Sequence, residues 1–182
     1  MSTSVFLKIY PTTKTGDFFK GNSQVKAHKE WIEIQEYSHT FQQPITAATR
    51  SSDLAPSARC NHEPASFKKF NDNATDNLMK ACWLGQCLDL TICIYRSLGD
   101  LTGPVGPNNK SLVINMERAY ITEYNITPGA EEGGTEEIKV VYNYIQYAFA
   151  ELDFAQGKLK SARQAVDWNW TTNEITAKLP SW

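Results

Sequence analysis

The sequence lacks several features that would assign a protein to a functional class at once. It contains no window of about 18 consecutive apolar residues, so no helix is expected to cross a membrane and no direct membrane insertion is expected. Its 18 basic and 20 acidic residues give a formal net charge of −2, which argues against nucleic-acid binding. The first residues carry no basic stretch ahead of an apolar run. We therefore expect synthesis in the cytoplasm without a signal peptide.

Cysteine and histidine are scarce, with four and three residues respectively. Cys60-x-His62 and Cys82-x4-Cys87 could in principle supply four zinc ligands. Their spacing differs from the common two-residue knuckles, and Cys82 falls inside an expected helix. The sequence therefore predicts free thiols, no metal and no cofactor.

Catalytic motifs are also missing. The chain has no G-x-S-x-G elbow, no H-E-x-x-H motif and no phosphate-binding glycine loop. The stretch HKEWIEIQEYSHTF contains His28 and His39, but no motif places either histidine beside a nucleophile. Adjacent glutamates at 131–132 and 136–137 flank two glycines, and such pairs more often solvate a connection than form a glycosidase site. We expect a protein that is not an enzyme and has no catalytic residues.

The chain is rich in alternating apolar and polar residues, and aromatic residues make up 12% of it. This pattern is typical of half-buried β-strands. The segments with this character are 4–10, 30–41, 59–70, 88–96, 112–126, 137–149 and a short one at 168–173. Residues 43–58 and 97–110 instead predict an extended loop and a long hairpin loop.

One segment predicts a helix. In NDNATDNLMKACWLG, an apolar stripe recurs at helical spacing through Thr75, Leu78, Met79 and Cys82. Asp72 or Asn73 is placed to accept hydrogen bonds from the first free amides, and Gly85 is placed to end the helix. We expect Leu78 to anchor the helix to the sheet, and Met79 and Trp83 to pack in the core.

These segments predict a mainly β fold: a small antiparallel β-barrel or two-sheet sandwich with one α-helix packed on its side. A chain of 182 residues is long enough to bury about 70% of its unfolded surface as one domain, residues 1–182.

Taken in order, several motifs resemble the Hcp family, the tube-forming proteins of bacterial type VI secretion systems. The likeness covers about residues 4 to 173, and its ordered set is more specific than any one motif. The motifs are Phe6–Ile9 (FLKI), Ser23-Gln24, His28-Lys29, Ile32-Glu33-Ile34, Tyr37-Ser38-His39, Phe67-Lys68-Lys69 with Asp72, Thr75, Leu78 and Ala81-Cys82, then Ile94-Tyr95-Arg96 and Asp167-Trp168-Asn169.

The resemblance implies a subunit that forms a homo-hexameric ring. It also implies stacking of rings into a tube inside a contractile sheath, a VgrG-type spike at the tip, and small effector proteins in the lumen. The protein itself would be secreted to the extracellular space or a target cell. The long loop is expected to contact other subunits or stacked rings, and its candidate residues are Gln43, Pro44, Ile45, Arg50, Asp53 and Leu54. Ser38 is the candidate for a residue that faces the lumen and touches cargo.

Two other classes of function stay open on sequence grounds. A monomeric β-sandwich that binds carbohydrate or another ligand could use aromatic residues such as Trp31 or Tyr37. A hydrolase would require activity that depends on one particular His or Glu. The chain also departs from the family pattern, because residues 97–110 are longer and richer in Gly and Pro, and because the loop at 43–58 lacks Gly.

Overall fold

The structure is a computed structural model that describes residues 3–12, 17–45, 56–96, 110–129, 133–153 and 158–176. The helical elements are α1 (Thr75–Leu84) and a single 3-10 turn, η1 (Lys26–His28). The strands are β1 (Thr3–Pro11), β2 (Ile32–Ile34), β3 (Glu36–Ser38), β4 (Phe41–Gln42), β5 (Asn61–His62), β6 (Ala65–Phe70), β7 (Leu88–Arg96), β8 (Lys110–Thr127), β9 (Thr135–Val141), β10 (Tyr144–Asp153) and β11 (Lys158–Asn169).

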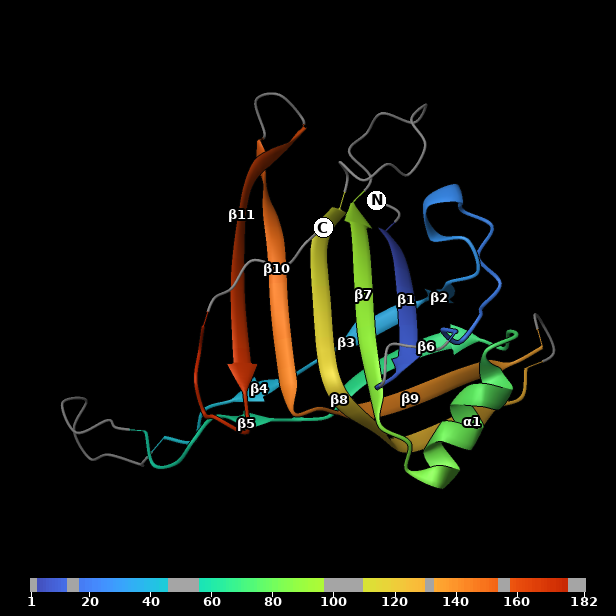
Figure 1. Ribbon diagram of the computed structural model, residues 1–182, viewed down its shortest axis with the longest axis horizontal. Coiled ribbons are helices and arrows are strands. Elements are labelled where there is room, and N and C mark those ends of the chain that lie inside the picture. Colours follow the sequence, from blue (N-terminus) through green and yellow to red (C-terminus); the bar gives the residue numbers. More distant parts are fainter. Residues whose placement is uncertain are drawn as a thin grey trace.

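The strands form two antiparallel layers that share β8 (Figure 1). The first half of β8 pairs with β7 on one side and β10 on the other, and this layer continues to β1, β2 and β11. The second half of β8 pairs with β9, which leads to β6 and β3. Helix α1 lies against the side of the second layer. The expected mainly β sandwich with one helix is confirmed, whereas the sheet does not close into a barrel among the described strands.

The change of layer within β8 has a local cause. Arg118 adopts a left-handed conformation with φ of 52°, which few residues other than glycine adopt. Its backbone N–H donates a hydrogen bond to Asp89 Oδ1 at 3.0 Å. This contact supports the bend, so one strand of 18 residues serves both layers.

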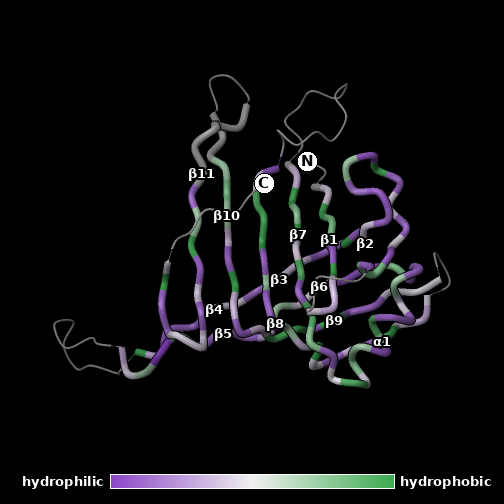
Figure 2. Tube along the Cα trace, viewed as in Figure 1, coloured by the Kyte–Doolittle hydropathy of each residue, from purple (hydrophilic) through white to green (hydrophobic). Residues whose placement is uncertain are grey.

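The core lies between the two layers. Leu7, Ile9, Ile32, Ile114 and Ile138 are fully buried there, as their alternation along the strands requires. Figure 2 shows the apolar stretches along β1, β7, β8 and β10. Within the described part of the chain, no helix has the length and apolar character needed to span a membrane.

Several of the strand boundaries predicted from the sequence were wrong. The segment 30–41 is three short strands, because Gln35 bends the chain and its N–H donates to Lys68 O. The segment 59–70 divides at Pro64 into β5 and β6, and the segment 137–149 divides near Tyr142 into β9 and β10. The last strand, β11, is much longer than the predicted 168–173.

Helix α1 ends at Gly85 as predicted, and Asp72 accepts a hydrogen bond at its start as predicted. Gly85 takes the left-handed conformation, and its N–H bonds to Cys82 O. The N-cap residue is Ala74, and Asp72 Oδ1 accepts the N–H of Ala74 at 2.9 Å. The core packing expected for Trp83 is wrong, because 77% of this residue is exposed on the last turn of α1.

Candidate assembly surfaces and the buried polar cluster

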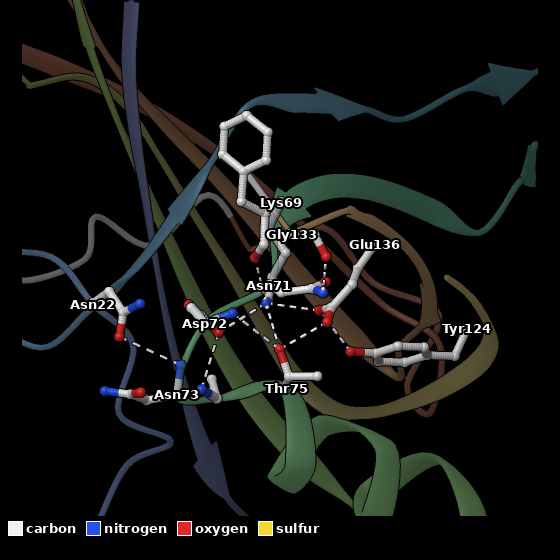
Figure 3. Close-up of polar contacts among 11 residues, drawn as sticks. Asn22, Lys69, Asn71, Asp72, Asn73, Thr75, Tyr124, Gly133 and Glu136 are labelled. Atoms are coloured by element: carbon white, nitrogen blue, oxygen red, sulfur yellow. Dashed lines mark hydrogen bonds and ion pairs between the residues drawn. The ribbon is translucent and has the colours of Figure 1, made fainter. Parts of the chain in front are cut away.

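A buried ion pair within the second layer lies where α1 begins. Lys69 on β6 and Glu136 on β9 are both excluded from solvent, and Lys69 Nζ lies 2.7 Å from Glu136 Oε2. Lys69 also lies 2.8 Å from Asp72 Oδ1 and donates to the hydroxyl of Thr75 at 3.2 Å. Tyr124 on β8 donates to Glu136 Oε2 at 2.7 Å (Figure 3).

The arrangement is structural in character. The hydroxyl of Thr75 donates to Glu136 Oε1 at 2.7 Å, so both carboxylate oxygens are occupied. A buried charge of this kind is tolerated only when it is paired and hydrogen bonded. The spaced residues Lys69, Asp72 and Thr75, noted in the sequence as separate motif positions, therefore meet at one point. They fix the first turn of α1 against three strands.

The outward face of the second layer is polar. Lys68 lies 3.1 Å from Glu36, and Lys139 lies 2.9 Å from Glu123. The hydroxyl of Ser66 donates to Glu137 Oε1 at 3.1 Å. Ser38 is exposed on this face, directly opposite Ser66 in the register of β3 and β6. Strands β3, β6 and β9 thus turn alternating residues into the core and present charged and hydroxyl groups to water.

A network of tyrosines and histidines lies at the other end of this layer. His39 Nε2 donates to Glu63 O at 3.0 Å, which leaves Nδ1 to accept from the hydroxyl of Tyr147 at 2.6 Å. Tyr37 lies 3.0 Å from the same hydroxyl. Burial lowers the pKa of His39 from 6.5 to about 4; the carbonyl of Glu63 opposes this shift, and His62 adds to it. His39 is therefore neutral at pH 7.

His28 occupies a separate apolar site outside the main core. Its ring stacks on Phe6 at 4.6 Å and meets the edge of Trp31 at 4.3 Å. Nε2 contacts the hydroxyl of Tyr95. Burial, followed by the charges of Lys110 and Lys8, lowers the pKa of His28 to about 4. Both histidines of the HKEWIEIQEYSHTF segment therefore pack against other aromatic rings, but they lie in different parts of the fold.

The long loop is described only at its base. Gln43 is exposed and donates to Ala58 O at 2.7 Å, and Ile45 pairs with Pro56 in an isolated bridge. Ser57 N–H donates to Pro44 O at 3.0 Å. The base is therefore an extension of the β4–β5 ribbon that projects from the body (Figure 1). The candidates Arg50, Asp53 and Leu54, and the insertion at 97–109, lie outside the described residues.

Among the described residues, two apolar surfaces are open to solvent. Trp83 and Leu84 are 77% and 78% exposed at the end of α1. A groove of about 630 Å³ lies on the first layer, with Phe41, Leu112, Phe149 and Val166 in its lining. Sequence reasoning missed both, because exposure of an apolar residue at a helix end or a strand end leaves no trace in periodicity.

The other residues considered in the sequence occupy varied positions. Among the described residues there is no group of three or more His, Cys, Asp or Glu side chains that could hold a metal. Cys60, Cys82, Cys87 and Cys93 are free thiols. Tyr37 is half-buried with its hydroxyl bonded, and half-buried Trp31 packs on His28, so neither ring is an open ligand platform. Leu78 is fully buried in the core.

These features define a class: a two-layer antiparallel β protein with one helix fixed to its side and with exposed polar and apolar surfaces. The sequence matches the family described as "Type VI secretion system effector, Hcp" over residues 6–149. The chain belongs to this Hcp family of type VI secretion. Hcp proteins are structural tube proteins, so the chain is not an enzyme.

Solved structures share the fold. A structure titled "Structure of a type six secretion system protein" aligns with a TM-score of 0.76 and 18% identity, over 96% of this chain and 100% of the other. Hcp1 from Salmonella typhimurium aligns with a TM-score of 0.68 and 14% identity, over 97% and 100%. The secreted protein Hcp3 from Pseudomonas aeruginosa aligns with a TM-score of 0.58 and 17% identity, over 93% and 99%. The comparison with curated proteins found no match.

Proposed function

We propose that the chain is the subunit of a type VI secretion inner tube. Six copies form a ring, rings stack into a tube within the sheath, and a VgrG-type spike caps it. The tube carries small effector proteins in its lumen and is itself secreted. Membership of the Hcp family supports a secreted type VI protein in general, and the surfaces of this chain support the more specific assignment.

The observation that carries the proposal is the polar outward face of β3, β6 and β9. A strand pair that faces a channel needs residues compatible with water on one side and a packed core on the other. Glu36, Lys68, Glu137 and Lys139 alternate with buried positions in this way. Positive and negative side chains alternate on this face. A channel wall of this kind would therefore not hold proteins of one net charge irreversibly. We assign this face, with Ser38 on it, to the lumen.

The base of the long loop supports the second part of the proposal. The β4–β5 ribbon that leads into the loop projects from the body (Figure 1), and 61% of Ile45 at its base is exposed. We assign the loop at 43–58, including Arg50, Asp53 and Leu54, to contacts between subunits or between stacked rings.

Native mass spectrometry and negative-stain imaging test the function directly. At micromolar concentration we expect a mass six times that of the 20.5 kDa chain and ring-shaped particles. In a bacterium with an active type VI system that lacks its own tube protein, the chain should restore secretion of small effectors. A monomer at every concentration would contradict the proposal and would favour a monomeric ligand-binding module.

A further inference from the structure

The exposed end of α1 is an apolar projection. Trp83 and Leu84 are the two most exposed large apolar residues in the described part of the chain. Helix α1 stops immediately after them at Gly85, whose left-handed backbone turns the chain away. A tryptophan and a leucine side by side in water expose apolar area, and burial of this area in a partner is favourable.

The groove on the first layer is an uncovered continuation of the core. Ile94, Leu112 and Tyr147 pack against the core cluster, whereas Phe149 and Val166 farther along are 39% and 46% exposed. The groove's volume of about 630 Å³ falls within the roughly 300–1,000 Å³ typical of pockets that hold a small ligand. It therefore has room for an indole ring and an isobutyl group together.

The chemistry of the lining selects an apolar occupant. None of the described residues that line the groove is charged. The hydroxyl of Ser111 donates to Ile94 O at 3.0 Å, and the hydroxyl of Tyr147 lies 2.6 Å from His39 Nδ1. The side-chain hydroxyls of the described lining are thus already engaged within the subunit. A polar or charged partner would lose its hydration in this groove without gaining new hydrogen bonds.

The projection lies on α1, whereas most of the groove is lined by residues of β8, β10 and β11. In Figure 1, α1 lies on the opposite side of β7 and β8 from β10 and β11. Two different complementary patches on opposite sides of one chain produce head-to-tail association, which closes into a ring or grows as a filament. We propose that Trp83 and Leu84 of each subunit insert into the groove lined by Leu112, Phe149 and Val166 of a neighbouring copy. This contact rests on the proposed function, because it is the lateral contact of the ring.

The test uses two variants that each remove one side of the contact. Trp83→Ser with Leu84→Ser removes the projection, and Val166→Asp places a charge in the groove. All three positions are exposed in the subunit, so each variant should keep the wild-type circular dichroism spectrum and melting behaviour of the isolated subunit. We expect each variant to raise the concentration at which rings form by at least about tenfold, as loss of an interface tryptophan typically does. Ile175→Asp is the matched control, because Ile175 is exposed but belongs to neither surface, and it should form rings normally.

Mixing the two variants tests whether these patches are partners of each other. The projection variant keeps an intact groove, and the groove variant keeps an intact projection. At a concentration where each alone is monomeric, an equimolar mixture should give one productive contact and hence a mixed dimer that grows no further. Native mass spectrometry distinguishes this dimer from either monomer and from a ring.

The outcomes separate this contact from the proposed function. If the wild type forms hexamers and both variants form them at the same concentration, the contact is wrong while the tube assignment stands. If both variants are monomeric but their mixture gives no mixed dimer, the two patches are not partners and the inference is overturned. A wild type that never assembles would refute the proposed function itself.

Discussion

Lys69 and Glu136 form an ion pair whose side chains are both wholly excluded from solvent, with 2.7 Å between Lys69 Nζ and Glu136 Oε2. Removing one partner leaves the other charge buried without compensation. Lys69→Met should therefore lower the free energy of unfolding by about 3–5 kcal/mol, measured by urea denaturation.

Lys139 offers a matched control for this prediction. It forms an ion pair of similar length with Glu123, at 2.9 Å, but both side chains are open to water. Lys139→Met should change the free energy of unfolding by less than about 1 kcal/mol. Equal effects of the two substitutions would show that burial does not determine the strength of the Lys69 contact.

Leu78 is the subject of a second prediction. It is fully buried on the face of α1 that meets the core, so Leu78→Ala should lower the free energy of unfolding by about 2–5 kcal/mol through lost burial and the cavity left behind. Lys80→Ala, on the exposed face of the same helix, should change it by less than about 0.5 kcal/mol. An unchanged denaturation midpoint for Leu78→Ala would mean that α1 does not depend on this contact.

The helix shows what the sequence can and cannot predict. Its position, its stop at Gly85 and the burial of Leu78 follow from spacing alone. The meeting of Lys69 with Glu136 does not, because 67 residues separate them and their adjacency depends on the β6–β9 register. The sequence prediction also missed most of strand β11, because this strand too depends on a distant partner. Its first half, KLKSARQ, has no alternation of apolar and polar residues, and its extended form follows from pairing with β10.

Other errors concern where one strand passes to another layer. Segment 137–149 has a continuous β-like composition, yet β9 and β10 belong to different layers. Local propensity carries no information on which layer a strand joins. The groove, the exposed Trp83 and the polar outward face all depend on how the strands and the helix pack in three dimensions. None of these surfaces could therefore be assigned from the sequence alone.

The pH dependence of stability is the third prediction. The pKa of His39 is about 4 in the folded protein and about 6.5 when unfolded, so protons bind the unfolded chain more readily between these values. His39 therefore contributes stability that is present above pH 6.5 and is lost as pH falls towards 4. At pH 5 the loss is about 1 kcal/mol, half the ideal linkage value because the ring is partly open to solvent.

The measurement compares urea midpoints of the wild type and His39→Gln at pH 7.5 and pH 5. The substitution should reduce the difference between the two midpoints. His28, whose pKa is also about 4, remains in both proteins and retains part of the dependence. The same difference in wild type and variant would show that His39 titrates normally in the folded state.

The long loop gives the fourth prediction. Replacing residues 46–55 by a short Gly/Ser linker keeps the Ile45–Pro56 bridge and the contact of Gln43 with Ala58 O, so the subunit should keep its melting temperature. Because we assign this loop to contacts between subunits or stacked rings, its loss should reduce ring or tube assembly as seen by electron microscopy. Tubes of normal length and yield would refute the assignment of this loop.

Ser38 gives the last prediction. It is exposed opposite Ser66, on the polar face that we assign to the lumen, and its side chain supports no core contact. Ser38→Arg should therefore leave the hexamer intact by native mass spectrometry. The larger, charged side chain would project from the wall and should reduce co-purification and secretion of a small effector severalfold. Ser38→Ala, which adds no bulk, is the matched control and should carry the effector normally. Wild-type secretion of every effector by intact Ser38→Arg rings would place Ser38 away from the cargo, because a bulky cation on a contacting wall position cannot be neutral to all of them.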